Sequence, residues 1–164
     1  MMGTMPRDFV WYFMKLGRNI ERADMTTRLL DAGVRAQLQV WDDHDAINGH
    51  QIVWGNILRA LDADQSYRRT IRASVKSKQV ARYIIEDPAF PRTITYCLSA
   101  VSESLARLPN HKLVLNELED IQQDILKPID YSDLGEPMKE LLNDIQLDLA
   151  AIHTSISQNW FTNQ

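Results

Sequence analysis

The sequence predicts an all-α fold, a mostly antiparallel bundle of about six to seven helices with long first and last helices. Apolar residues recur every three or four positions along most of the chain. No stretch alternates apolar and polar residues for long enough to make a convincing strand. The segments between the apolar stripes are short, and short connections favour antiparallel neighbours.

The first helix is predicted by a stripe with a 4-3-4-3-4-3 spacing. The stripe consists of Phe9, Phe13, Leu16, Ile20, Ala23, Thr27 and Leu30. Pro6 and Gly33 fit as its boundaries. Val34, Leu38 and Trp41 leave open an extension by about two turns, before residues 42–45 and Asn48-Gly49 break the pattern.

Shorter helices follow in the middle of the chain. Trp54, Ile57 and Leu61 share one face of a helix over residues 51–61, which the turn at 62–64 ends. Residues 66–86 form no single clean stripe, so we expect two short helices with a break at 74–77. The prolines at 88 and 91 end this region.

Three helices complete the prediction. Pro91 opens a helix whose stripe runs from Ile94 to Leu108, and another spans residues 114–125. Asp133 and Glu136 resemble a capping box, with Pro137 in the first turn of the last helix. Its stripe continues to Trp160, over about six turns.

The composition indicates one soluble domain over residues 1–164. Hydrophobic residues make up 45% of the chain and charged residues 24%, as in ordinary globular proteins. The apolar runs are far shorter than the roughly 20 residues that cross a bilayer. Cys97 is the only cysteine, which excludes an intramolecular disulfide and fits a reducing cytoplasm.

Charge is distributed unevenly. Residues 1–110 hold 15 Lys and Arg against 12 Asp and Glu, whereas residues 111–164 hold 3 against 10. The two parts could attract each other or bind separate partners, and both interpretations stay open.

The first helix carries the most informative polar residues. Lys15, Asn19, Arg22 and Thr26 gather on one narrow face at 100° per residue. Glu21 falls among apolar residues, so we expect it to be partly buried and paired with an arginine. We favour a structural ion-pair network of Arg18, Glu21, Arg22, Asp24 and Arg28. The alternatives are a carboxylate that binds a cationic ligand or transfers a proton, and exposure of the whole set to solvent.

The segment Gly17–Asp24, with the pattern G-R-x-x-E-R-A-D, resembles the signature helix of the bacterial alpha-E domain family. Trp54-x-x-Ile57-Leu58 and residues 90–93 also resemble elements of that family. Its members contain two related helical halves, and this chain resembles the C-terminal half. The resemblance implies that Arg18, Glu21, Arg22 and Asp24 are signature residues. It also implies an accessory role beside ATP-grasp-type amide ligases or transglutaminase-like proteins.

A second candidate is a basic stripe between residues 68 and 82, with one arginine beyond it. Its members are Arg68, Arg69, Arg72, Lys76, Lys78 and Arg82, followed by Arg92. We favour a solvated helix face. The alternatives are an acidic partner, including residues 111–164, and a phosphorylated ligand or nucleic acid. Sparse aromatic residues and the net charge of −4 disfavour nucleic acid.

Catalytic and metal-binding motifs are weak. The four histidines are scattered, and Asp42, Asp43 and Asp45 lack the ordered ligand pattern of an EF-hand. Cys97 lies on an apolar stripe, where a buried core residue is expected. We therefore predict no catalytic residues, no metal and no cofactor.

The sequence favours a non-catalytic interaction or accessory module. The expected partners are an ATP-grasp-type or transglutaminase-like protein, the missing N-terminal half, or a second copy. The rival is a ligand-binding or catalytic subunit with a polar cleft around Glu21. A buried, arginine-paired Glu21 favours the first interpretation, and an accessible Glu21 in a polar pocket favours the second.

Overall fold

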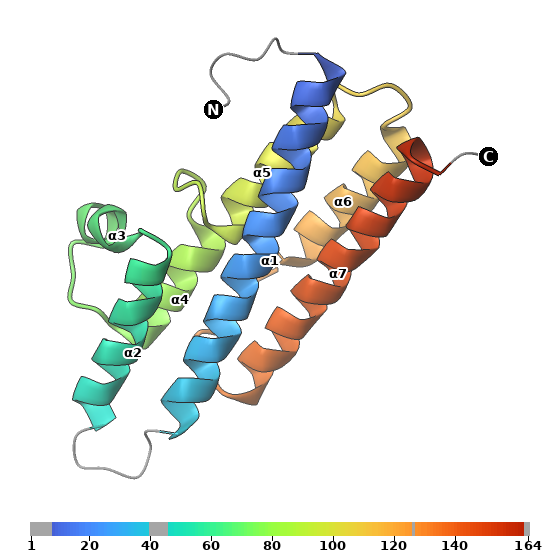
Figure 1. Ribbon diagram of the computed structural model, residues 1–164. Helices are drawn as coiled ribbons and strands as arrows, with labels where there is room; N and C mark the ends of the chain where they lie inside the picture. Colours follow the sequence, from blue (N-terminus) through green and yellow to red (C-terminus); the bar gives the residue numbers. More distant parts are fainter. Residues whose placement is uncertain (1–7, 40–45, 126, 163–164) are drawn as a thin grey trace.

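The computed structural model describes residues 8–39, 46–125 and 127–162, and all seven elements in these ranges are α-helices (Figure 1). The elements are α1 (Phe9–Gln39), α2 (Ala46–Ala60), α3 (Asp64–Ile71), α4 (Ser77–Glu86), α5 (Ile94–Leu105), α6 (Lys112–Ile125) and α7 (Glu136–Trp160). The all-α prediction, with long first and last helices, is confirmed. Pro6, Trp41 and the acidic residues 42–45 lie outside the described residues.

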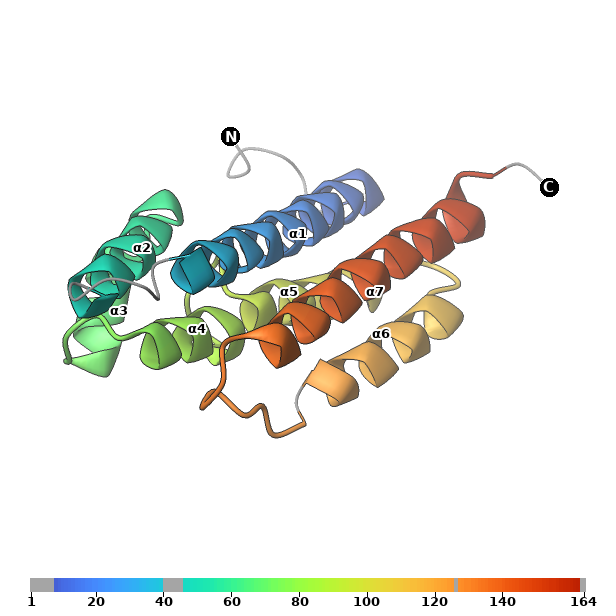
Figure 2. The same ribbon diagram turned by 90° about the horizontal axis from the view of Figure 1, so that it is seen from below.

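The helices form two groups of four that share α1 and α5. One group is α1, α5, α6 and α7, and the other is α1, α2, α4 and α5, with α3 against α2 and α4. Figure 2 shows α1 and α2 on one side of the molecule and α4, α5 and α6 on the other. The start of α1 lies at the end of α7, where Phe13 contacts Trp160, so these two helices are antiparallel.

The core fills both groups. Fully buried large side chains come from α1 to α7, including Leu30, Trp54, Tyr67, Leu118 and Leu142. Trp54 Nε1 donates a hydrogen bond to Gln37 Oε1 at 2.6 Å, which joins α2 to the last turns of α1. Trp54 and Gln37 are both buried, so an indole N–H or an amide oxygen left without a partner there would destabilise the fold.

Gly33 does not end the first helix, as the sequence had indicated, but lies inside α1. A Cβ atom there would lie 3.2 Å from Ile57 Cγ1 and 3.7 Å from Trp54 Cη2. Glycine is therefore used for the close approach of α1 and α2. The extension past Gly33 is confirmed as far as Gln39.

Other helix boundaries also differ from the prediction, and Pro91 does not open α5, whose N-cap is Thr93. Asn48 and Gly49 lie within α2, which begins at Ala46. The capping box before α7 is wrong, because Gly135 is the N-cap and Asp133 Oδ1 accepts from the Gly135 N–H at 2.7 Å. Pro137 does lie in the first turn of α7, as expected.

The break between the two short middle helices is confirmed. Helix α3 ends where Arg72 adopts a left-handed conformation (φ 52°) and donates its N–H to the carbonyl of Arg68. Helix α4 starts five residues later, at Ser77. The basic stripe is therefore divided between two helices and the segment that connects them.

Within the described ranges, no helix is long and apolar enough to cross a membrane.

Candidate functional site

The polar face predicted on α1 packs against α5. Lys15 Nζ lies 3.2 Å from Glu103 Oε2, and Thr26 donates its hydroxyl proton to the carbonyl of Arg92 at 2.8 Å. Between them Asn19 is 4% exposed and donates its amide to the Lys15 carbonyl. The Lys15–Glu103 and Thr26–Arg92 contacts fix the position of α5 and the residues before it along α1.

Arg22 lies on the same side of α1 and is half-buried. Burial raises the pKa of Cys97 on α5 to about 11, while the charges of Arg22 and Arg92 oppose this shift. Arg92 Nη2 lies 3.4 Å from Asp62 Oδ2. Arg22 therefore contributes positive charge beside α5, and Cys97 is buried in the core, as the sequence predicted.

Glu21 is exposed, so the predicted burial of this carboxylate is wrong. Within the described part of the chain, no cationic group lies within 4.0 Å of it. Arg28, one of the expected partners, instead donates Nε to Asp24 Oδ2 at 2.8 Å. The helical pattern placed Glu21 among Val10, Met14, Met25 and Ala32, but this face of α1 is itself exposed, so it does not bury the carboxylate. Glu21 also borders an open groove.

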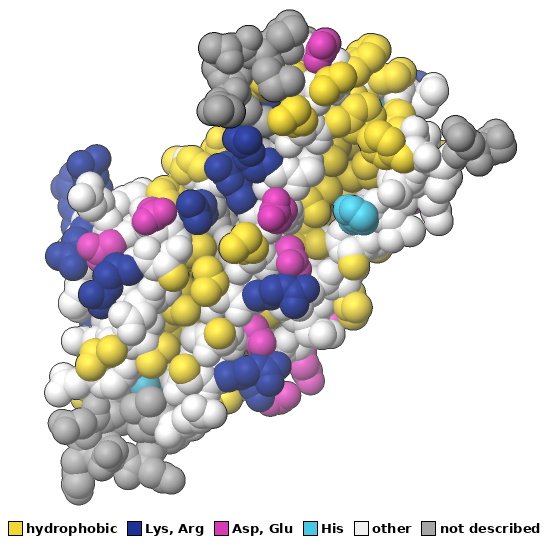
Figure 3. All heavy atoms as spheres, viewed as in Figure 1, with side chains coloured by type: hydrophobic (Ala, Val, Ile, Leu, Met, Phe, Trp, Pro, Cys, Tyr) yellow, Lys and Arg dark blue, Asp and Glu magenta, His cyan; other side chains and the backbone are white. Residues whose placement is uncertain are grey.

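This groove, with a volume of about 810 Å³, lies between the first half of α1 and the second half of α7. Its apolar lining includes Phe13, Leu16, Ile20, Leu149, Ile156 and Phe161. Its polar lining includes Glu21, Asp24, Arg28 and His153. Figure 3 shows hydrophobic side chains gathered over the start of α1 and the end of α7, with acidic side chains and a histidine beside them.

Aromatic rings form one end of the groove. The Phe13 ring packs edge-on against Trp160 and Phe161, with centroid distances of 5.5 Å and 5.1 Å. Phe161 is nevertheless 65% exposed. Phe9, four residues before Phe13, is 57% exposed. Large apolar side chains that remain exposed together indicate a binding surface.

Residues 1–161 match the Alpha-E family, described as a predicted alpha-helical domain with a conserved ER motif. The chain belongs to the Alpha-E family. Its sequence contains a single Glu-Arg dipeptide, Glu21-Arg22, which locates this motif in the middle of α1. No match was found among curated proteins or among solved structures.

The two residues of the Alpha-E motif point to different parts of the molecule. Consecutive side chains on a helix are separated by about 100°. Arg22 therefore lies toward α5, whereas Glu21 borders the groove beside α7. The motif thus combines one half-buried residue on the α5 side of α1 with one residue at an accessible surface.

The basic stripe is not one helical face. Arg68 and Arg69 lie on α3, Arg72 and Lys76 lie in or beside the connection, and Arg82 lies on α4. All five are exposed. Arg68 and Arg82 form local ion pairs with Asp64 and Glu86. Among the described residues, no ion pair joins the stripe to the acidic region 111–162.

The described residues contain no group of three or more His, Cys, Asp or Glu side chains that could hold a metal ion. His111 contacts the carbonyl of Leu108 at 2.7 Å, and His153 lines the α1–α7 groove. The groove thus offers a carboxylate, an imidazole and a large apolar surface. Sequence patterns gave no sign of His153, because its role depends on where α7 packs.

Proposed function

We propose that this Alpha-E chain is a non-catalytic interaction module that binds an amphipathic helix of a partner protein in the α1–α7 groove. The observation that carries this proposal is an open apolar groove bordered by Glu21, a carboxylate without an ion pair in the described part of the chain. A helix bound in a groove presents apolar residues to its floor and polar residues to its rim.

The lining of the groove supports this occupant. Two antiparallel helices form its walls, and apolar side chains extend from Ile20 and Leu149 to the aromatic end at Phe161. An exposed aromatic ring can serve as an anchor that loses its contact with water when a partner binds. A basic residue of the partner helix would pair with Glu21, which adds specificity to the apolar contact.

The partner we propose is an ATP-grasp-type amide ligase, for which this chain acts as an accessory component in peptide or amide ligation. The sequence resemblance to alpha-E proteins, which accompany such ligases, supports this choice. A transglutaminase-like protein, a missing N-terminal half and a second copy of the chain are the other occupants that an experiment can identify.

A ligand-binding or catalytic role is the second candidate, because Glu21 is accessible and His153 lines the same groove. This role requires a small molecule that reaches both side chains. The extended apolar lining favours a protein helix over a polar substrate. Turnover of a small molecule that is lost on Glu21→Gln, without any protein partner, would favour the second candidate.

Two neighbouring alanines of α7 provide a matched test. Ala150 and Ala151 are both exposed, but only Ala150 lines the groove. We expect Ala150→Arg to weaken binding to the purified ligase by at least about tenfold, as measured by calorimetry, because the long side chain obstructs the groove. Ala151→Arg should leave the affinity unchanged.

The outcomes separate the surface from the partner. Equal affinity of the wild type and Ala150→Arg would reject the groove as the binding surface. No binding of the wild type to the ligase would reject this partner. In that case, a dimer in sedimentation equilibrium that Ala150→Arg dissociates would identify a second copy as the occupant.

A further inference from the structure

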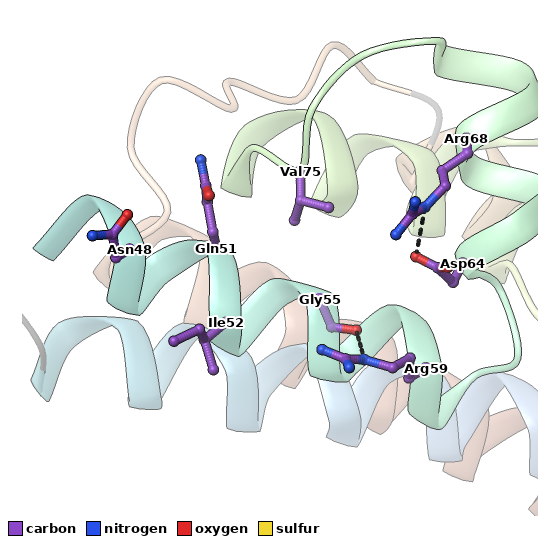
Figure 4. Close-up of a pocket in the computed structure, with 8 residues that line it drawn as sticks. All are labelled: Asn48, Gln51, Ile52, Gly55, Arg59, Asp64, Arg68 and Val75. Carbon is purple, nitrogen blue, oxygen red and sulfur yellow. Dashed lines mark hydrogen bonds and ion pairs between the residues drawn. The ribbon is translucent and has the colours of Figure 1, made fainter.

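A second concave site lies on the other side of α1, between α2, α3 and the segment that precedes α4 (Figure 4). It has a volume of about 520 Å³, and Arg59 and Arg68 both line it. We propose that this pocket binds the phosphate group of a small phosphorylated molecule. Arg59 was absent from the basic stripe predicted from the sequence.

The side chain of Arg59 is held along α2 by its own helix. Its Nε donates a hydrogen bond to the carbonyl of Gly55 at 3.2 Å. A Cβ atom at Gly55 would lie 3.4 Å from Arg59 Nη2, so glycine leaves this face of α2 open for the guanidinium. Only Nε has a protein acceptor in the described part of the chain, which leaves the two Nη groups available to a ligand.

Arg68 reaches the pocket from α3. Its Nε lies 3.2 Å from Asp64 Oδ1. Among the described residues, neither of its Nη groups donates a hydrogen bond to an acceptor. Figure 4 shows the two arginines on different helices, with Asp64 near the Arg68 guanidinium. Two guanidinium groups against one carboxylate leave the pocket with a net positive charge.

The polar lining matches the oxygens of a phosphate. The side-chain amides of Asn48 and Gln51 also line the pocket and can donate hydrogen bonds. Together with the four Nη groups, they offer more donors than the two oxygens of a carboxylate can accept. Charge-assisted bonds from arginine to phosphate are among the stronger hydrogen bonds in proteins.

The surrounding charge and the size of the pocket define the ligand further. Residues 59–82 contain seven Lys and Arg against two Asp, which attracts anions to this part of the molecule. Figure 3 shows basic side chains gathered over α3. None of the residues that line the pocket is aromatic, so no platform for a nucleic-acid base is present there. The volume is typical of a small-molecule site.

The test uses inorganic phosphate as the probe, titrated into the protein by calorimetry with the ionic strength held constant by sodium chloride. Arg59→Gln and Arg68→Gln should each weaken saturable phosphate binding by about tenfold or more. Arg69→Gln is the matched control, because Arg69 is exposed on α3 but does not line the pocket. It should change the affinity by less than about twofold.

Three results would overturn the proposal. The first is that phosphate shows no saturable binding to the wild type. The second is that Arg69→Gln weakens binding as much as Arg68→Gln, because this would indicate general attraction to a basic surface. The third is that acetate binds as tightly as phosphate, which would reject selectivity for phosphate.

Thermal unfolding of each variant verifies that it is folded. Because Arg59 and Arg68 do not line the α1–α7 groove, these results are independent of the proposed protein partner.

Discussion

Cys97 is fully buried on α5, and its thiol lies close to the Pro91 carbonyl, with Sγ at 3.6 Å. Burial raises its pKa from 9.0 to about 11, despite the nearby positive charges of Arg22 and Arg92. The thiolate is therefore a minor species at neutral pH. This environment gives the residue a measurable effect on the pH dependence of stability.

The folded state holds the Cys97 proton more tightly than the unfolded state does. Its stabilising contribution is complete below pH 9 and is lost as the pH rises toward 11. The loss amounts to at most about 3 kcal/mol. Urea unfolding of the wild type and of Cys97→Ala between pH 8 and pH 11 measures it. Their difference in unfolding free energy should shrink as the pH rises, and a constant difference would contradict this assignment.

Glu21→Ala should change the free energy of unfolding by less than about 0.5 kcal/mol, because the side chain is exposed and has no ion pair in the described ranges. A buried, arginine-paired carboxylate would cost roughly 2–4 kcal/mol instead. Leu30→Ala in the core of the same helix is the reference and should cost about 2–5 kcal/mol. A loss at Glu21 as large as that would restore the buried-network interpretation.

Helix α1 contains two glycines whose surroundings differ. Gly17 borders the α1–α7 groove, and a Cβ atom there would meet nothing within 4 Å. Gly33 is buried against Ile57. Glycine weakens a helix relative to alanine, so its effect on stability depends on whether there is space for a side chain.

Gly17→Ala should stabilise the protein by about 0.5–1 kcal/mol, because it favours the helix without a clash. Gly33→Val should destabilise it by about 1–3 kcal/mol, since the larger side chain separates α1 from α2. Chemical denaturation of both variants measures these opposite changes. A stabilising Gly33→Val substitution would contradict the close approach of the two helices.

Arg72 ends α3 in the left-handed conformation that favours glycine. Arg72→Gly should therefore stabilise the protein by about 0.5–1 kcal/mol, as measured by its unfolding midpoint in urea. Arg69→Gly, inside α3, should destabilise it by a similar amount. If Arg72→Gly is also destabilising, the left-handed conformation of Arg72 does not reduce the stability of the protein, and the prediction is wrong.

Local patterns predicted the helices well where neighbouring residues determine the structure. The break after Ile71 and the stop at Glu86 follow from the irregular stripe and from the prolines beyond it. The prediction that Gly33 ends the first helix was wrong, because this glycine allows the close approach of Ile57, which is distant in the sequence. The prediction for Glu21 was wrong because the apolar residues on its face of α1, such as Met14 and Met25, are exposed, and the helical pattern alone does not show which apolar face is covered.

At the scale of the whole molecule, α1 lies between two candidate binding surfaces. The groove with Glu21 lies between α1 and α7, and the pocket with Arg59 and Arg68 is lined by α2 and α3. Figure 1 shows α2 and α7 on opposite sides of α1. The first is apolar with an acidic rim, and the second is basic. The acidic side chains of the groove, Glu21 and Asp24, both come from α1, so the charge imbalance between residues 1–110 and 111–164 does not explain the difference between the two surfaces.

The central claim is that the α1–α7 groove binds the partner helix. Hydrogen–deuterium exchange with and without the purified ATP-grasp-type ligase tests it most directly. Binding should slow exchange in the two segments that line the groove, residues 13–28 and 146–157. A complex in which these segments exchange as in the free protein, while protection appears only in α2 to α4, would contradict the claim.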